Sequence, residues 1–267
     1  MNKPGGFIRY APPLLITLIL VIGHFAFGML ESYQAIMLSI ICSMGTEVIL
    51  SLLMTGKVRN LSSAYITGIS VSILIRSTWL WPFAITAILS IMSKYVLRYR
   101  GTHIWNPSNF GITWMLALYP FSVAGLSIQW GNNLLPLLVI WILGLIIVWR
   151  VRRLHITLIY VLSFIFFSYL RSRITGDSFF TEVAPLTGPM YQLFIFFMIT
   201  DPATTVKNRK WQAAVVFLIA LVEFILRLNQ FIYAPFYALF LVGPAAMFAY
   251  LYLSRPKEVK IEAPAGI

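Results

Sequence analysis

The sequence predicts an all-α integral membrane protein with about ten transmembrane helices. Of its 267 residues, 60% are apolar and only 10% are charged, whereas about a quarter of the residues in a soluble domain are charged. The mean hydropathy of +0.85 shows that most of the chain prefers hydrocarbon to water. The apolar runs are long and continuous, without the alternation of barrel strands. Because backbone groups in lipid must pair internally, we expect the spans to be helices.

We expect a helix wherever an apolar run approaches the length of a bilayer span, which is about 17 to 25 residues. Such runs lie at 12–30, 34–56, 61–76, 79–97, 108–125, 134–150, 155–170, 184–200, 211–228 and 232–253. The first run lacks a small-residue cleavage site, so we do not expect it to be a signal peptide. We therefore predict one transmembrane domain over residues 1–267, with a polar cytoplasmic tail at 254–267.

The basic residues predict the orientation of these spans. With a cytoplasmic N-terminus, the cytoplasmic side carries Lys3, Arg9, Lys57, Arg59, Arg98, Arg100, Arg150, Arg152, Arg153, Lys207, Arg209, Lys210, Arg255, Lys257 and Lys260. The opposite side carries only Arg76, Arg171, Arg173 and Arg227. The positive-inside rule therefore places both termini in the cytoplasm. It also explains the net charge of +12 without a nucleic-acid partner.

The sequence does not favour a metal site or a haem site. Cys42 is the only cysteine, which excludes an internal disulfide and an iron–sulfur cluster ligated by this chain alone. A haem needs a facing pair of axial ligands, and His24, His103 and His155 offer no such pair, so we expect no haem. The sequence contains no zinc motif, phosphate-binding loop or catalytic triad. We therefore predict no metal site and no catalytic residues.

The chain contains a candidate inverted repeat. Residues 81–98 align without gaps to residues 210–227, and the Trp-Asn-Pro at 105–107 then corresponds to the Tyr-Ala-Pro at 233–235. These segments are spans four and nine, and a separation of five spans reverses the second copy across the membrane. Inverted repeats usually enclose a site near the midplane, lined by broken helices. The expected repeats cover about 12–125 and 134–253.

Two segments interrupt the apolar runs with proline. In residues 100–111, Asn106 can cap a helix and Pro107 can take its first position. In residues 197–205, a long apolar run stops at Asp201-Pro202. The N–H groups of the next turn need a partner, either an anionic or hydrogen-bonding ligand or the Asp and Thr side chains themselves. The simpler alternative is that each proline ends a helix at the membrane surface, but the matched positions in the repeat favour a ligand site.

Ionisable residues at membrane depth are costly and usually functional. Glu47, Lys94, Asp201 and Glu223 lie within or at the ends of predicted spans. Lys94 and Glu223 occupy equivalent positions of the repeat, and one hypothesis is that they form a buried ion pair across the centre. The alternative is that each side chain extends to its own membrane interface.

Three segments carry a family resemblance: residues 93–96 (SKYV), 105–111 (WNPSNFG) and 196–205 (FFMITDPATT). They resemble the RnfD/NqrB membrane subunits of Rnf-type and sodium-pumping NADH:quinone oxidoreductase complexes. The likeness covers about residues 60–253, and the short chain is more similar to stand-alone RnfD-like members, such as those in enediyne-biosynthesis clusters. It implies ten helices in two inverted five-helix units, as in urea channels, within the cytoplasmic (inner) membrane of a bacterium.

The resemblance also implies a flavin, either FMN or riboflavin. Family members attach FMN to a Thr in a Ser-Gly-Ala-Thr motif, which this sequence lacks, so the implied flavin is non-covalent. The implied cofactor-binding residues are Lys94, His103, Trp105, Asn106, Pro107, Ser108, Asn109, Thr200, Asp201, Pro202, Thr204 and Thr205. Lys94 or Arg76 would lie near N1 and C2=O, where positive charge raises the flavin potential. Candidates for stacking on the ring are Trp105, Phe110, Phe197 and Trp130.

Two functions of different classes follow. The first is an electron-transfer subunit that passes electrons across or within the membrane through a flavin. It would need partner redox subunits or an FMN-binding protein, because this chain has no cluster or nucleotide site; the sequence also allows a homo-oligomer. The second is a channel or transporter for a small neutral solute or a flavin, which rests on the shared architecture alone. A scaffold subunit that has lost its cofactor is a third interpretation.

Overall fold

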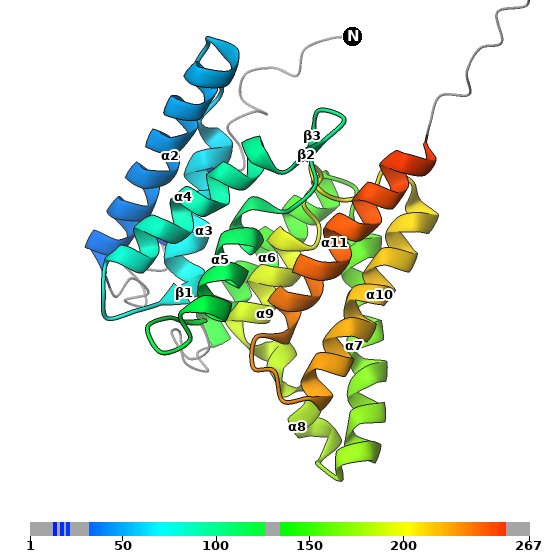
Figure 1. The fold of residues 1–267 in the computed structure, drawn as a ribbon. Helices are drawn as coiled ribbons and strands as arrows, with labels where there is room; N and C mark the ends of the chain where they lie inside the picture. The colour runs from blue at the N-terminus through cyan, green and yellow to red at the C-terminus, as the bar shows by residue number, and fades with distance from the viewer. Residues whose placement is uncertain (1–12, 15–16, 19, 22–31, 126–133, 255–267) are drawn as a thin grey trace, which may run out of the picture.

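The computed structural model describes residues 13–14, 17–18, 20–21, 32–125 and 134–254, which form a bundle of helices (Figure 1). The helices are α2 (Tyr33–Thr55), α3 (Ser62–Leu74), α4 (Trp81–Val96), α5 (Pro107–Leu118), α6 (Leu134–Arg150), α7 (Leu154–Thr175), α8 (Phe179–Val183), η1 (Ala184–Thr187), α9 (Pro189–Leu193), η2 (Phe194–Met198), α10 (Arg209–Leu228) and α11 (Ala234–Leu253). The short strands β1 (Ile75–Arg76) and β4 (Ala124–Gly125) pair antiparallel, as do β2 (Arg98–Tyr99) and β3 (Thr102–His103). The all-α fold class is confirmed.

Four of these helices, α2, α7, α10 and α11, are long and apolar enough to cross a membrane. Shorter apolar helices coincide with most of the other predicted spans, whereas the run at 12–30 lies largely outside the described residues. Two predicted span boundaries were wrong, because residues 75–76 and 124–125 leave their helices and pair as strands β1 and β4. The predicted span 184–200 was also wrong as a single helix, since η1 ends at Thr187 and a separate helical segment begins at Pro189 and continues through α9 and η2 to Met198.

Helix α2 shows how the bundle distributes its side chains. Its buried residues recur every fourth position and are small or polar, including Ser39, Ser43 and Glu47. Its exposed positions carry large apolar side chains, such as Met37 and Leu53. This pattern is the reverse of a soluble amphipathic helix and is typical of membrane bundles, where small residues allow close packing and hydrocarbon surrounds the outside. The pattern supports a membrane environment.

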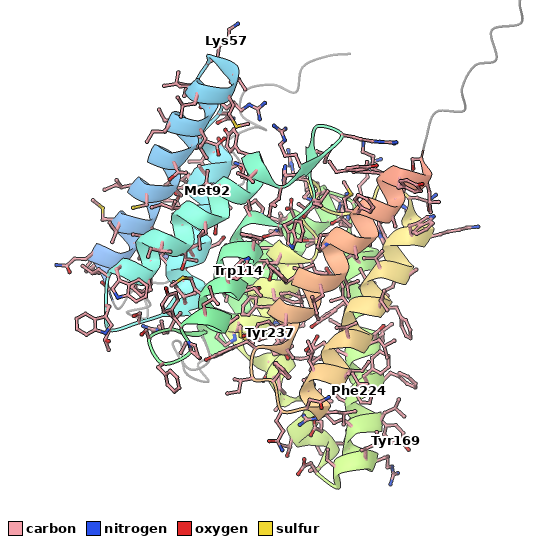
Figure 2. All side chains as sticks on the ribbon, viewed as in Figure 1. Lys57, Met92, Trp114, Tyr169, Phe224 and Tyr237 are labelled. Carbon is pink, nitrogen blue, oxygen red and sulfur yellow. The ribbon has the colours of Figure 1, made fainter. Side chains whose placement is uncertain are left out.

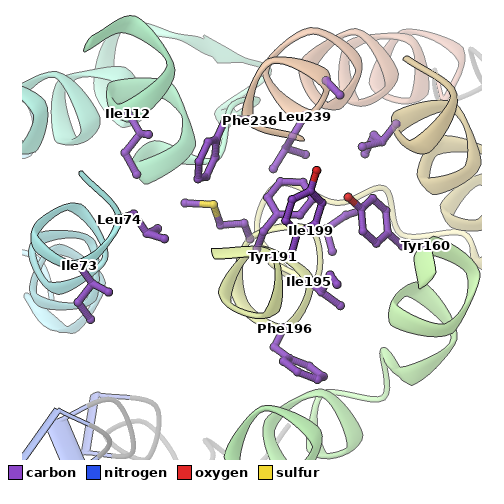
Figure 3. Close-up of a cluster of buried hydrophobic side chains, with 14 of the residues drawn as sticks. Ile73, Leu74, Ile112, Tyr160, Tyr191, Ile195, Phe196, Ile199, Phe236 and Leu239 are labelled. Atoms are coloured by element: carbon purple, nitrogen blue, oxygen red, sulfur yellow. The ribbon is translucent and has the colours of Figure 1, made fainter. Parts of the chain in front are cut away.

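The helices pack in two groups that meet at the centre. In the first group α4 packs between α2 and α5, and in the second α10 packs between α7 and α11. The groups join where α5 contacts α11, and a large apolar core fills the region around α9 (Figures 1 and 3). Gly111 allows the closest approach in the first group, because a Cβ there would lie 2.5 Å from the carbonyl oxygen of Thr86 on α4.

Basic residues gather at one end of the bundle. The connections α2–α3, α4–α5, α6–α7 and η2–α10 all lie at this end, which Figure 2 marks with Lys57. They carry most of the predicted cytoplasmic arginines and lysines, apart from those at the masked ends of the chain. We refer to this as the basic end. Helix α8 and the lower end of α7, near Tyr169, lie at the opposite end (Figures 1 and 2).

Candidate functional site

The two proline-broken segments meet directly. Asn106 caps α5, because its Oδ1 accepts a hydrogen bond from the backbone N–H of Asn109 at 3.0 Å. The side-chain amide of Asn106 then donates to Asp201 Oδ2 at 3.1 Å, although the two residues are 95 positions apart. Pro107 follows as the first helical residue, where its missing N–H costs nothing. The sequence therefore predicted correctly that these two motifs contain helix breaks, and the structure brings them together.

Asp201 organises the turn after the second break. Its Oδ1 accepts the backbone N–H of Ala203 at 3.0 Å, and its Oδ2 accepts the Thr204 hydroxyl at 2.9 Å. The Thr205 hydroxyl donates to the backbone carbonyl of Asp201 at 2.5 Å. Of the two partners considered for the free N–H groups, the Asp side chain is therefore the one found here. Thr204 and Thr205 shape the turn.

A second connection links the first broken segment to α11. Pro244 lies inside α11 and cannot donate an N–H to the carbonyl of Phe240, four residues earlier. The indole N–H of Trp105 donates to that carbonyl at 3.0 Å. The Trp105 ring also lies against Phe110 and Phe240, with ring centroids 5.9 and 6.0 Å apart. Trp105 therefore joins the two helix groups.

A single π-helical turn precedes Thr200-Asp201. The backbone N–H of Ile199 donates to the carbonyl of Phe194, five residues earlier, at 3.1 Å. Such turns are rare and occur often at functional sites. Phe196 within it packs on α6, where a Cβ at Gly144 would lie 2.6 Å from the ring. No sequence signal predicted this turn, because only the proline at 202 suggested an irregular backbone.

A cavity of about 320 Å³ opens beside these turns. Its apolar wall comes from α3, α6 and the π-helical turn, and Figure 3 shows Ile73 and Leu74 on one side with Phe196 on the other. Its polar residues are Ser63, Thr67, Ser70, His103, Asn106, Ser108, Thr200 and Asp201. Pockets that bind small molecules have volumes of about 300–1,000 Å³ with a few polar groups. The contributions of α3 and α6 to this cavity were not predicted, because the sequences of both helices have the composition of ordinary apolar spans.

The predicted cofactor-binding residues divide into two sets. Those that line the cavity are His103, Asn106, Pro107, Ser108, Thr200, Asp201 and Pro202, and the stacking candidate Phe197 joins them. The others, Lys94, Trp105, Asn109, Thr204 and Thr205, belong to the described part of the chain but are not among the residues that line this cavity. Asn109 donates to the carbonyl of Phe236 at 3.2 Å and so fixes α5 to α11. The stacking candidate Trp130 lies outside the described residues.

The predicted ion pair between Lys94 and Glu223 was wrong. Lys94 Nζ lies 2.6 Å from Glu47 Oε2, and the Tyr95 hydroxyl donates to the other carboxylate oxygen of Glu47 at 2.7 Å. The reason is that α4 packs against α2, whereas Glu223 on α10 faces α7 and α9. Lys94 also lies 3.4 Å from the hydroxyl of Ser63 in the cavity wall. The carboxylate of Glu47 therefore compensates the positive charge of Lys94, which contacts the cavity wall at Ser63.

Two basic groups outside the helices have perturbed pKa values near the mouth of the cavity. Burial lowers the pKa of His103, and the opposing attraction of Asp201 is smaller. His103 is therefore neutral at neutral pH and can both donate and accept a hydrogen bond. Burial also lowers the pKa of Arg153, again opposed by Asp201. The mouth thus combines a neutral imidazole, an amide and a carboxylate.

The polarity of this cavity fits a flavin ring. A flavin has one edge rich in nitrogen and oxygen and an opposite apolar edge, and the cavity lining likewise offers both polar and apolar side chains. Thr200 and Ser108 donate their hydroxyl protons to Phe196 O and Asn106 Oδ1, so their oxygens remain available as acceptors. The neutral His103 can donate. The chain matches no protein-family model and no curated protein sequence.

Proposed function

We propose that this protein is a membrane electron-transfer subunit that holds a flavin non-covalently in the cavity between α3, α5, α6 and η2. The observation that carries the proposal is the hydrogen bond between Asn106 and Asp201, which joins both family-like motifs at the polar mouth of that cavity. Bound flavin would supply one- and two-electron redox chemistry. The resemblance to RnfD/NqrB subunits supports the same assignment.

The chain's own residues would bind and orient the ring. His103 and the second N–H of the Asn106 amide would donate to ring acceptors, and Thr200 would accept. Phe196, Phe197 and the isoleucines of α3 would contact the apolar part and exclude water. Lys94 would act only indirectly, because Glu47 neutralises it. Asp201 would position Asn106 and would not contact N1 or C2=O, where negative charge develops.

We also propose that the ten spans form two inverted five-helix repeats. The packing supports this, since α4 lies between α2 and α5 as α10 lies between α7 and α11. These central helices contain the segments that align in the sequence, 81–98 and 210–227. The concentration of arginine and lysine at the basic end supports cytoplasmic termini in a bacterial inner membrane.

Partner proteins are required if electrons cross the membrane. The cavity would give the chain one redox centre, and one centre within the bundle would not by itself carry electrons across the whole membrane. Redox subunits or an FMN-binding protein would supply the next centre, and a homo-oligomer would bring two cavities into one complex. Trp141 and Trp149 on the exposed face of α6 offer apolar surface beside the cavity for such contacts.

The absorption spectrum of the protein purified in mild detergent tests the flavin proposal. We expect flavin bands that remain with the protein through gel filtration and are released into the supernatant on denaturation, because no covalent attachment motif is present. A protein that stays colourless after incubation with both FMN and riboflavin contradicts the proposal.

The second candidate is a channel or transporter for a small neutral solute or a flavin. The observation that favours it is the predominantly apolar wall of the cavity, which carries fewer polar groups than apolar ones. Flux of labelled riboflavin or urea into proteoliposomes tests this function. Flux by a colourless protein would support the channel, and its absence would exclude transport of these two solutes.

A further inference from the structure

A second cavity lies at the end of the bundle opposite the basic end. Its volume is about 380 Å³, and its lining includes Arg171, Gly188, Met190, Tyr191, Arg227 and Phe231. These residues come from the end of α7, the start of α9 and the end of α10. Arg171 and Arg227 make part of its wall polar. None of the proposed flavin contacts lies here.

Glu223 lies behind this cavity, buried within the bundle with 1% of its surface exposed. Its Oε1 accepts the Tyr191 hydroxyl at 2.6 Å, and its Oε2 accepts the Tyr160 hydroxyl at 2.5 Å. Figure 3 shows the hydroxyl ends of these two tyrosines close together. Among the described residues no lysine or arginine forms an ion pair with Glu223. A buried carboxyl group with only neutral donors is costly as an anion and is readily neutralised by a proton.

The surrounding charges, in contrast, favour the ionised form of Glu223. Arg227 lies one helical turn along α10, and Arg171 of α7 and Arg227 both pair with Glu182 of α8. Two arginines that share one carboxylate leave one net positive charge near Glu223. The buried residues of α11, the other neighbour of α10, are apolar. Burial thus favours the neutral acid, whereas two hydroxyl donors and one net positive charge favour the anion, so the site can hold or release a proton.

Tyr191 is the connection between Glu223 and the cavity. It lines the cavity and donates to Glu223, whereas Tyr160 is fully buried and, in the described structure, lies outside the cavity lining. We propose that Glu223 is a proton-binding site that exchanges with the end opposite the basic end through Tyr191. A proton from cavity water binds the Tyr191 oxygen as the hydroxyl proton moves to Glu223 Oε1. One O–H bond forms as another breaks, Tyr191 stays neutral, and Glu223 becomes a carboxylic acid.

Infrared spectroscopy of the full chain in lipid tests this site without any flavin. In a pH titration we expect a carboxylic-acid C=O band that grows as the pH falls and is lost in Glu223→Gln. Tyr191→Phe and Tyr160→Phe each remove one hydrogen bond to the carboxyl group, so both should shift that band. If the acid band were still present and unchanged in Glu223→Gln, the assignment would be overturned. The same would follow if neither tyrosine variant shifted the band.

The route is tested by the rate of protonation after laser release of protons from a caged acid. Tyr191→Phe should slow protonation of Glu223 by about 100-fold, the usual effect of removing a positioned proton-transfer group. Tyr160→Phe is the matched control, because it removes an equivalent hydrogen bond but leaves the path through Tyr191, and it should retain the wild-type rate. Equal rates in the two variants would overturn the route. The proposed flavin is absent from this experiment, so its failure and that of the flavin proposal are distinguishable.

Discussion

The two helix groups of this protein each bury a glutamate, but they stabilise it differently. In the first group Glu47 of α2 receives Lys94 and Tyr95 from α4, so a cation compensates the carboxylate. In the second group Glu223 of α10 receives only the hydroxyls of Tyr160 and Tyr191. The difference shows that a buried glutamate can be held by a cation from a neighbouring helix or by neutral hydroxyl donors alone. The first arrangement borders the proposed flavin cavity, since Lys94 also contacts Ser63 in the cavity wall.

The largest expected effect comes from breaking the ion pair. Lys94→Met should lower the free energy of unfolding by about 3 kcal/mol, because it leaves the carboxylate of Glu47 buried without a cation. Lys94→Met combined with Glu47→Gln should recover part of this loss, since no buried charge remains. Thermal unfolding in detergent measures both. Losses that simply add in the double variant would mean that the two side chains are not coupled.

The next largest effect concerns packing within each group. Gly111→Ala should lower stability by about 2 kcal/mol, because the new Cβ would lie 2.2 Å from Ser90 Oγ and 2.5 Å from a backbone carbonyl oxygen on α4. Gly243→Ala in α11 is the matched control, since its Cβ would meet only a leucine methyl group at 3.3 Å. We expect little change there in the same unfolding assay. Equal losses at the two positions would show that the first group is not packed more tightly than the second.

A smaller effect is expected at the bond that joins the two groups. Trp105→Phe removes the indole N–H that satisfies the carbonyl of Phe240, at a cost of about 1 kcal/mol. Pro244→Ala restores the backbone N–H that α11 lacks at that carbonyl, so the cost of Trp105→Phe should fall in this background. A double-mutant cycle measures the coupling. An unchanged cost would show that Pro244 is not the reason why this carbonyl needs Trp105.

The smallest effect is a pH dependence at His103. Burial lowers the pKa of this side chain below its usual 6.5, so the unfolded chain binds the proton more tightly than the folded chain does. The contribution to stability is therefore complete above pH 6.5 and is lost as the pH falls through the folded-state pKa. His103→Gln should make the stability less dependent on pH below 6.5, as followed by thermal unfolding at several pH values. An identical pH profile in the variant would contradict this assignment.

The sequence predicted the helical membrane fold because long apolar runs have no other stable form in lipid. It also identified Asn106 and Asp201, since proline next to a capping side chain marks a broken helix. The contact between them could not be derived from spacing alone, because it joins residues 95 positions apart. Proline thus revealed where the helices break but not what the breaks contact.

The errors have a common physical cause. The pairing of Lys94 with Glu223 was inferred from their equivalent positions in the repeat. A side chain instead contacts the helix that packs beside its own, which for Lys94 on α4 is α2. The walls supplied by α3 and α6 were missed for the same reason, since apolar periodicity does not tell which helices enclose a cavity. Pro244 was the one overlooked signal in the sequence, because a proline within a span frees a carbonyl that another side chain must satisfy.

The most direct test of the central claim is a flavin-binding titration with the cavity blocked. Ile73→Trp would place a larger side chain in the cavity from the wall facing Phe196. Met37→Trp on the exposed face of α2 is the matched control. We expect the wild type and Met37→Trp to quench the fluorescence of added FMN or riboflavin, and folded Ile73→Trp not to quench it. Quenching by Ile73→Trp equal to that of the wild type would contradict the claim that this cavity holds a flavin.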